Sequence, residues 1–196
     1  GIPTGNTTRG HRFHSQGLIE ITDVNDYEKL LLEQGKVIAD YDLRKEKIRL
    51  GVQAAAKENK GIAVIDEALL DEVASLNEWP VPLVGKFDER FLEVPTEALI
   101  SSMKEHQKYF HMLDEKGAMM PNFITLANIE SKDPQQVIEG NERVIRPRLS
   151  DAAFFFETDK KTTLEDRREQ LKKIVFQTKL GTVYDKTERV SVLAGK

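Results

Sequence analysis

The alternation of apolar and polar residues over the first two thirds of the chain predicts helices separated by short strands. The range Leu43–Asn59 carries apolar residues at helical spacing with Lys and Arg between them, which predicts an amphipathic helix with its charges in water. Asp66 is placed to cap a second helix that runs to Leu76. Short runs rich in apolar residues predict strands at Leu18–Ile21, Val37–Ala39, Ile62–Ile65, Leu83–Phe87, Phe91–Val94 and Asn122–Ile129.

Two further helices are expected in this part of the chain. Asp23 or Asn25 can cap the first, which ends near Gly35, a residue suited to a left-handed C-terminal position. Thr96 is a plausible cap for the second, whose apolar positions continue at helical spacing to Phe110. The strand predicted at Asn122–Ile129 is apolar on both faces and is therefore expected to be buried on both, or nearly so.

The pattern becomes almost purely helical from Pro134 onward. Pro134 suits a first helical turn, and Pro147 is expected to kink or divide the helix that follows. Thr163 and Asp166 resemble a capping box, and a last helix is expected to start near Thr182. These elements predict an α+β fold, with a mixed sheet-and-helix body over residues 1–160 and a helical extension over residues 161–196.

Composition excludes several classes of protein. The 196 residues contain 29 Lys+Arg and 33 Asp+Glu, a net charge of 29 − 33 = −4, and no Cys. Disulfides, thiolate zinc sites and Cys nucleophiles are excluded, and any contact with a polyanion has to come from a local patch. No apolar run approaches the length that crosses a bilayer. The chain lacks an initiator Met, so we expect it to be a fragment of a longer protein.

The segment from Thr7 to His14 is the first candidate for chemistry. It holds Arg9, His11, Arg12 and His14 beside hydroxyl side chains. Arg can grip a phosphate with two parallel hydrogen bonds, so this segment can bind RNA or a nucleotide. The alternative is a solvated loop whose Arg residues pair with surplus acids. A metal site at the two His residues is disfavoured because no third ligand is marked nearby.

Arg143, Arg146 and Arg148 form a second cluster. The first two are three residues apart, so a helix would set them on one face, with Arg148 just beyond the Pro. Such a cluster suits a phosphate backbone or an acidic partner surface. The alternative is internal pairing with nearby carboxylates, namely Glu139, Glu142 and Asp151.

The remaining notable side chains favour structural roles. His106 lies near Ser102 and Glu105, yet adjacent helix residues diverge and no orienting acid is marked, so catalysis is the minority interpretation. The sequence shows no P-loop, Rossmann glycine pattern, HExxH or GxSxG. Trp79 is expected in the core, as is the run Phe154–Phe156, for which a subunit interface is the alternative.

Five long strings in order carry a family resemblance: TTRGHRF (7–13), EWPVPLVGKF (78–87), FLEVP (91–95), SSMKEHQKYF (101–110) and NERVIRPRLSDAAFFF (141–156). Together they closely resemble the β subunit of bacterial heterotetrameric glycyl-tRNA synthetase. The resemblance runs from end to end, and several unusual strings in the right order are far more specific than one short motif.

The resemblance implies a cytoplasmic assembly of two α and two β subunits that joins glycine to its tRNA with ATP and Mg. The α subunit of that family carries the class II active site, and the longer β subunit supports tRNA recognition. This segment is similar to the B3/B4 region of phenylalanyl-tRNA synthetase β subunits, and the residues after 160 lead toward a helical HD-like domain. The B3/B4 region of those relatives edits mischarged tRNA, but its editing residues cannot be matched to positions here.

On this interpretation the segment has no catalytic residue, no metal ligand and no cofactor of its own. Ten basic side chains are then expected to contact tRNA phosphates or acidic surface on the α subunit or the remaining β domains. They are Arg9, His11, Arg12, Lys86, Arg90, Lys104, Lys108, Arg143, Arg146 and Arg148. Two alternatives stay open: a deacylating pocket that uses His106 or His11, and a structural spacer.

Overall fold

The computed structural model describes residues 4–195. The chain divides into two compact units, residues 1–152 and residues 153–196. The division falls inside the long helix α5 (Pro134–Lys160) and not after residue 160.

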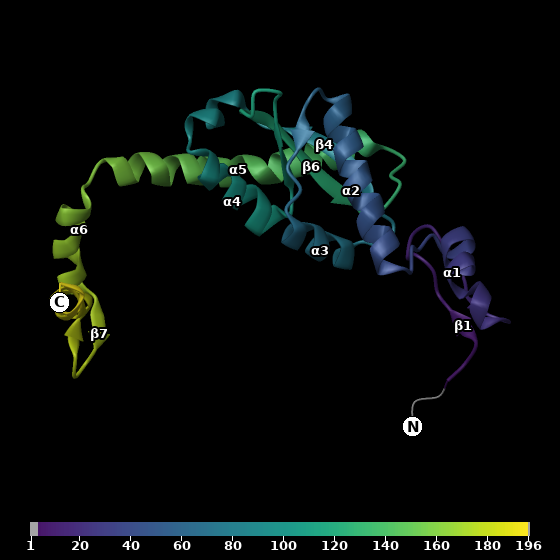
Figure 1. The fold of residues 1–196 in the computed structure, drawn as a ribbon, viewed down its shortest axis with the longest axis horizontal. Coiled ribbons are helices and arrows are strands. Elements are labelled where there is room, and N and C mark those ends of the chain that lie inside the picture. Colours follow the sequence, from purple (N-terminus) through teal and green to yellow (C-terminus); the bar gives the residue numbers. More distant parts are fainter. Residues whose placement is uncertain (1–3, 196) are drawn as a thin grey trace. The chain divides into compact units, whose positions relative to one another are not determined.

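A four-stranded antiparallel sheet forms the centre of the first unit (Figure 1). Its spatial order is β3 (Ile62–Ala63), β5 (Phe110–Leu113), β6 (Met119–Ala127) and β4 (Val81–Lys86). The predicted strands at residues 62–65, 83–87 and 122–129 are confirmed with shifted ends. Strand β5 was not predicted, and its first residue, Phe110, was expected to end a helix. Pro82 lies within β4, which is an edge strand, and a Pro is tolerated there because no partner on that side needs its N–H.

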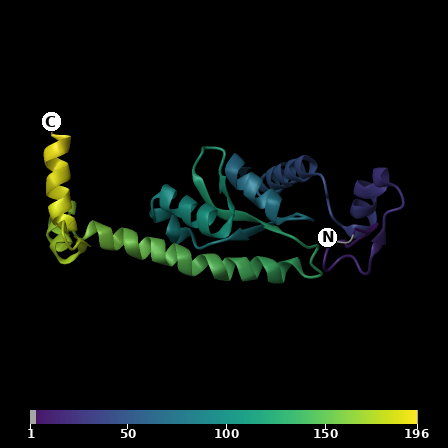
Figure 2. The same cartoon turned by 90° about the horizontal axis from the view of Figure 1, so that it is seen from below.

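Helices cover both faces of this sheet (Figure 2). Helices α2 (Tyr41–Glu58) and α3 (Glu67–Leu76) lie on one face, and the part of α5 before residue 153 runs along the other. The core on the α2 and α3 side contains fully buried side chains from both layers, including Val52, Leu70, Phe110, Met112 and Ile124. The cap predicted at Asp66 is confirmed, and Asp40, which was not predicted, caps α2 in the same way: each carboxylate accepts a hydrogen bond from the third backbone N–H that follows.

The first forty residues form a small hairpin and a short helical segment. β1 (Thr7–Thr8) pairs with β2 (Ile19–Glu20), and the chain then forms η1 (Val24–Asp26), α1 (Tyr27–Leu30) and η2 (Leu31–Gly35). The expected cap at Asp23 is confirmed.

Two expectations for this first segment are wrong. The left-handed residue at the end of this helical segment is Lys36 (φ 53°) and not Gly35. Gly35 instead packs against the first loop: its carbonyl accepts from His11 N at 2.6 Å, and a Cβ on Gly10 would collide with the Gly35 backbone. Residues 37–39 do not form a strand; Ile38 N donates to Glu78 O at 3.0 Å.

The segment between β4 and β5 is helical where a strand was expected. Residues 91–94 belong to or follow the 3₁₀ helix η3 (Glu89–Glu93), which turns the apolar side chains of Phe91 and Val94 inward. Next come α4 (Thr96–Ser101), whose N-cap is Pro95 and not Thr96, and the π-helix η4 (Ser102–Gln107). Helix η4 ends at left-handed Lys108 (φ 60°), so Phe110 starts a strand.

Helix α5 is continuous through Pro147, so of the expected kink or division the division is wrong and the kink stays a prediction. Pro147 is exposed, and so is Arg143, whose carbonyl is the group that loses a helical N–H donor. Water can satisfy that carbonyl, which explains why the helix persists.

The second unit contains a hairpin as well as helices. α6 (Leu164–Gln170), η5 (Leu171–Lys173), β7 (Val175–Gln177), β8 (Gly181–Thr182) and α7 (Val183–Ala194) follow the end of α5. The cap at Thr163 and the start of the last helix near Thr182 are confirmed, but a purely helical extension is not, because β7 and β8 pair. Phe154 and Phe155 are exposed, which corrects their assignment to the core.

We predict opposite stability changes for two Gly→Ala substitutions in the first unit. A Cβ at Gly85 in β4 would collide with the ring of Phe123, so Gly85→Ala should lower the free energy of unfolding by about 1–3 kcal/mol. A Cβ at Gly140 in α5 meets nothing within 4 Å, so Gly140→Ala should raise it by about 0.5–1 kcal/mol. Urea unfolding followed by circular dichroism measures both; equal effects would contradict the packing described for β4 and β6.

Candidate functional site

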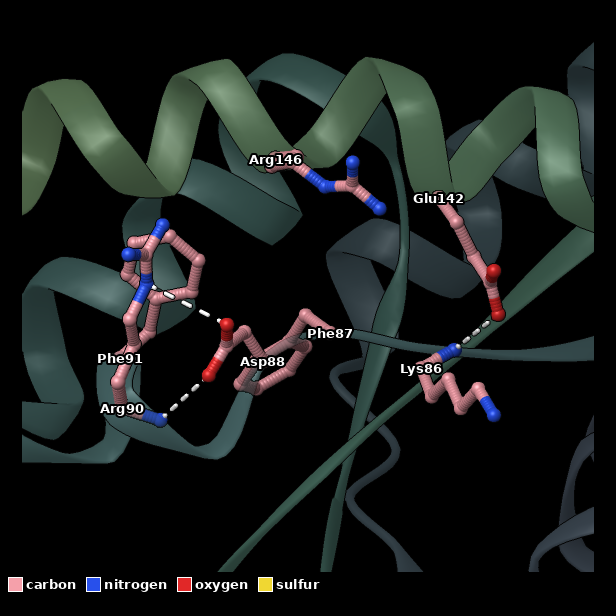
Figure 3. A pocket seen from close by; sticks show the side chains of 7 residues that line it. All are labelled: Lys86, Phe87, Asp88, Arg90, Phe91, Glu142 and Arg146. Atoms are coloured by element: carbon pink, nitrogen blue, oxygen red, sulfur yellow. Dashed lines mark hydrogen bonds and ion pairs between the residues drawn. The ribbon is translucent and has the colours of Figure 1, made fainter.

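A pocket of about 460 Å³ lies in the first unit where β4 ends (Figure 3). It is lined by side chains from the end of β4, from η3 and from α5. These are Lys86, Phe87, Asp88, Arg90, Phe91, Glu142 and Arg146. Three predicted contact residues, Lys86, Arg90 and Arg146, are therefore brought together although they lie in two separate parts of the sequence.

Hydrogen bonds from backbone N–H groups to side-chain carboxylates hold the walls of this pocket in place. Asp88 caps η3, and its Oδ1 accepts from the backbone N of Arg90 at 3.0 Å. Glu142 Oε1 accepts from the backbone N of Lys86 at 2.9 Å, which ties α5 to the end of β4. Arg146 is four residues after Glu142, and Figure 3 shows both side chains projecting from the same side of the helix.

The charges that line the pocket do not cancel. It has three cations and two carboxylates, a difference of 3 − 2 = +1. Arg90 faces Asp88 at 3.4 Å and lies 4.9 Å from the centre of the Phe91 ring. Within residues 4–195, neither the ammonium of Lys86 nor the guanidinium of Arg146 has an acidic partner within ion-pair distance. Phe87 and Phe91, both buried, supply an apolar floor. The excess of positive charge around this floor suits the pocket to an anion.

The three Arg residues of α5 do not form one cluster. All three are exposed, and the described part of the chain shows no ion pair between them and Glu139, Glu142 or Asp151. The internal pairing that we kept as an alternative is therefore not observed. Arg148 turns back along its own helix and donates from Nη1 to Val144 O at 2.8 Å, whereas Arg146 lines the pocket.

Arg9 and Arg12 are exposed at the start of the chain. The Arg12 guanidinium lies 5.6 Å from the centre of the Phe13 ring, and Phe13 is 70% exposed. The sequence analysis missed Phe13, although an aromatic residue after two Arg residues is a pattern typical of nucleic-acid surfaces.

His11 is a structural residue, which corrects its place among the contact candidates. It is 1% exposed; its Nε2 donates to Asn128 O at 2.6 Å, and its Nδ1 accepts from the backbone N of Phe13 and His14. His14 Nε2 accepts from the backbone N of Glu130 at 2.9 Å. The two imidazoles thus fasten the first segment to the loop after β6, and both ring nitrogens of His11 are occupied.

Lys104 and Lys108 are both paired with carboxylates within the chain, and their contact with tRNA or a partner stays a prediction. Lys104 Nζ lies 2.7 Å from Asp66 Oδ2, and Lys108 Nζ lies 2.8 Å from Glu72 Oε1. The hydrogen bond from Lys104, helped by the backbone N of Leu69, lowers the pKa of Asp66, and Asp66 in turn raises the pKa of Lys104. These two cations stabilise the start and side of α3.

The structure gives no catalytic arrangement around His106. Its ring is exposed, and Ser102 Oγ donates to Ala98 O, so the two side chains do not pair. Among the described residues there is no group of three or more His, Asp or Glu side chains that could hold a metal. No helix within residues 4–195 is long and apolar enough to cross a membrane.

Trp79 is half-buried at the surface and not in the core. Its Nε1 donates to Glu130 Oε1 at 2.8 Å, and Lys47 Nζ lies 4.6 Å from the centre of its ring. The roles of Asp88 and Glu142 were not predicted from the sequence. The position of Asp88 directly before the 3₁₀ helix η3 is a capping signal, but the contact of Glu142 with β4 depends on tertiary structure.

We predict that His11→Ala lowers the free energy of unfolding by about 1–3 kcal/mol, because the carbonyl of Asn128 and two backbone N–H groups lose their partner. His106→Ala, at an exposed position, is the matched control and should change it by less than about 0.5 kcal/mol. Chemical unfolding of the two variants beside the parent chain tests this. An equal loss in both would mean that the contacts of His11 do not stabilise the fold.

The Asp66–Lys104 pair predicts a pH dependence. The folded-state pKa of Asp66 is lowered, so its contribution is present above the ordinary Asp pKa of about 3.9 and is lost as the pH falls through the folded value. Parent and Lys104→Ala should therefore differ in unfolding midpoint at pH 6 and converge toward pH 2. Burial lowers the pKa of His111. Because His111 is present in both proteins, its effect on the pH dependence of stability largely cancels in the difference between them. A difference that stays constant from pH 6 to pH 2 would refute the assignment.

A family model and three curated relatives of this chain all describe the β subunit of the same enzyme. The family model described as "Glycyl-tRNA synthetase beta subunit" matches residues 1–196. A glycine–tRNA ligase β subunit of Marinobacter nauticus is 66% identical over 196 residues, which is 100% of this chain and 28% of that protein. The one from Hahella chejuensis is 65% identical over the same length and share. One from Klebsiella pneumoniae is 54% identical over 195 residues, again 28% of its length.

The chain thus spans about 28% of the length of the curated relatives that it matches. The family model covers it from its first residue to its last, and the strings noted in the sequence lie within that match. The chain therefore belongs to the glycyl-tRNA synthetase β-subunit family.

Proposed function

We propose that this chain is part of the β subunit of a glycine–tRNA ligase and that it supports tRNA binding and assembly of the enzyme. The observation that carries the proposal is a match over the whole chain to relatives that bear this name, at up to 66% identity. The partners are then the α subunit, glycine tRNA and the remaining domains of the β subunit.

The division of labour in this proposal leaves the chemistry to the α subunit. ATP and Mg are used there to attach glycine, in a cytoplasmic assembly of two α and two β subunits. The present segment contributes no catalytic residue to the reaction. Its first unit is proposed to be a B3/B4-type domain, and its second unit to lead into a helical domain.

The basic side chains that have no acidic partner among residues 4–195 support a role in RNA binding. Arg9 and Arg12 are exposed beside Phe13, and Arg143 and Arg146 are exposed on α5. Contacts of this kind go to phosphates and position an RNA without reading its sequence. Recognition of glycine tRNA as such is therefore assigned to other parts of the enzyme.

Neither alternative function has support from a specific contact. A deacylating pocket would need an available imidazole with an orienting partner, but His11 is buried with both nitrogens occupied, and His106 does not pair with Ser102. A purely structural spacer would need Arg143 and Arg146 to hold the fold together through ion pairs. Both are exposed, and within the described residues neither makes such a pair.

We predict that Arg9→Ala/Arg12→Ala in the complete α and β assembly weakens tRNA binding in a salt-dependent way. Loss of two phosphate contacts should reduce the slope of log K against log salt by roughly 1.4–1.8, since each contact contributes about 0.7–0.9. Filter binding from 50 to 200 mM salt measures the slope. Lys57→Ala/Lys116→Ala is the control, because it removes the same charge at two exposed positions away from this segment.

Unchanged affinity and slope in Arg9→Ala/Arg12→Ala would remove the RNA role of the first segment. An equal loss in the control would mean that net charge, and not this segment, is responsible. Size-exclusion chromatography of each variant separates a loss of RNA binding from a loss of assembly.

A further inference from the structure

The pocket at the end of β4 has an unusual division of roles between its acids and its bases. The carboxylates of Asp88 and Glu142 each accept a hydrogen bond from a backbone N–H and so serve to shape the pocket. Lys86 and Arg146 line the same pocket, and neither has an acidic partner within ion-pair distance among the described residues. A pocket built in this way has the charge to hold an anion, while its own acids are occupied.

We propose that this pocket, formed by Lys86, Arg90 and Arg146, binds one phosphodiester group of the tRNA backbone. The inference rests on the proposed function, since it assigns to the RNA a defined contact point on this segment. It also goes beyond it, because it selects three of the ten basic side chains predicted from the sequence and gives them a common ligand.

The arrangement of donors favours phosphate over carboxylate. The three basic residues come from three elements, the end of β4, η3 and α5, and line a space of about 460 Å³. A phosphodiester presents two charged non-bridging oxygens and two weaker ester oxygens in a tetrahedral arrangement, so donors can approach it from several directions, whereas a carboxylate presents two oxygens in one plane. Arg90 is held against the Phe91 ring at 4.9 Å, which keeps its guanidinium in place beside the pocket.

The surroundings favour a nucleic-acid backbone over an acidic protein surface. Arg143 lies three residues before Arg146 on the same helix and is exposed. Positive charge therefore continues beyond the pocket along α5 at a spacing of about one helical turn. A backbone with a charge at every nucleotide can use both positions at once, and we commit to that ligand.

The test measures tRNA binding by the complete α and β assembly in which single pocket residues are replaced. Arg146→Ala should weaken binding about tenfold or more and reduce the salt slope by about 1, and Lys86→Ala should act in the same direction. Arg146→Lys keeps the charge but not the paired donors, so it should keep the slope and recover only part of the affinity. Lys57→Ala is the matched control. Lys57 lies in α2, across the sheet from α5, and removing its exposed charge should change neither the tRNA affinity nor the salt slope.

Glu142→Gln gives a prediction of opposite sign. The amide oxygen can still accept from Lys86 N, so the pocket keeps its shape while it loses one negative charge. Binding of tRNA should become a few times tighter. Weaker binding in this variant, with thermal unfolding unchanged, would contradict a phosphate in the pocket.

Steady-state aminoacylation distinguishes the source of the phosphate. For Arg146→Ala we expect the KM for tRNA to rise while the KM for ATP stays unchanged; a rise for ATP alone would overturn the assignment to RNA. Separation of the α and β subunits on size-exclusion chromatography, with tRNA binding lost only as a consequence, would instead show an acidic protein partner. Circular dichroism and thermal unfolding confirm that each variant is folded.

The outcomes also separate this inference from the proposed function. If Arg9→Ala/Arg12→Ala weakens tRNA binding but Arg146→Ala and Lys86→Ala do not, the RNA role stands and the pocket assignment is wrong. If no variant changes tRNA affinity or its salt dependence, both are wrong.

Discussion

Burial of strand β6 on both faces is the constraint on which the rest of the first unit depends. Phe123 and Ile124 are neighbours in an extended strand, so they point to opposite faces, and both are 0% exposed. Ile124 packs into the core with α2 and α3. Phe123 stacks on Tyr109 with ring centres 4.5 Å apart, and the Tyr109 hydroxyl donates to Asn141 of α5 at 2.6 Å. A helix is therefore required on each side of the sheet, and the one on the Phe123 side places Glu142 and Arg146 over the end of β4.

The distribution of charge follows from that architecture. Several acidic side chains are engaged within the chain: Asp66 pairs with Lys104, Glu72 pairs with Lys108, and Asp88 and Glu142 accept from backbone N–H groups. A chain with a net charge of −4 can still expose unpaired cations, because many of its acids already have partners. Net charge alone would have argued against a polyanion ligand, whereas the contacts of individual carboxylates show where positive charge is left over.

Local signals made much of the fold predictable, and long-range contacts explain what was not. Helices α2 and α3 and the cap at Asp66 follow from periodicity and capping within a few residues. Four residues, Phe91–Val94, are too few to separate a strand period from a 3₁₀ period, so η3 was missed. Lys108 adopts a left-handed conformation, and without a Gly at this position the sequence did not indicate that the helix ends there. For the site, the basic residues were visible in the sequence, but the burial of His11 depends on Asn128, which is 117 residues away.

The continuity of α5 through Pro147 decides which Arg residues can share a ligand. If the helix ended there, Arg146 and Arg148 could converge on one anion, as their closeness in sequence suggests. In an unbroken helix two residues apart are about 200° apart around the axis, so the two side chains point to different sides. Arg146 therefore finds its neighbours in Lys86 and Arg90, sixty and fifty-six residues earlier in the chain, and not in the Arg-rich string to which it belongs. An anion site on this segment is a product of the packing of α5 on the sheet, which is why reading the basic string by itself could not locate it.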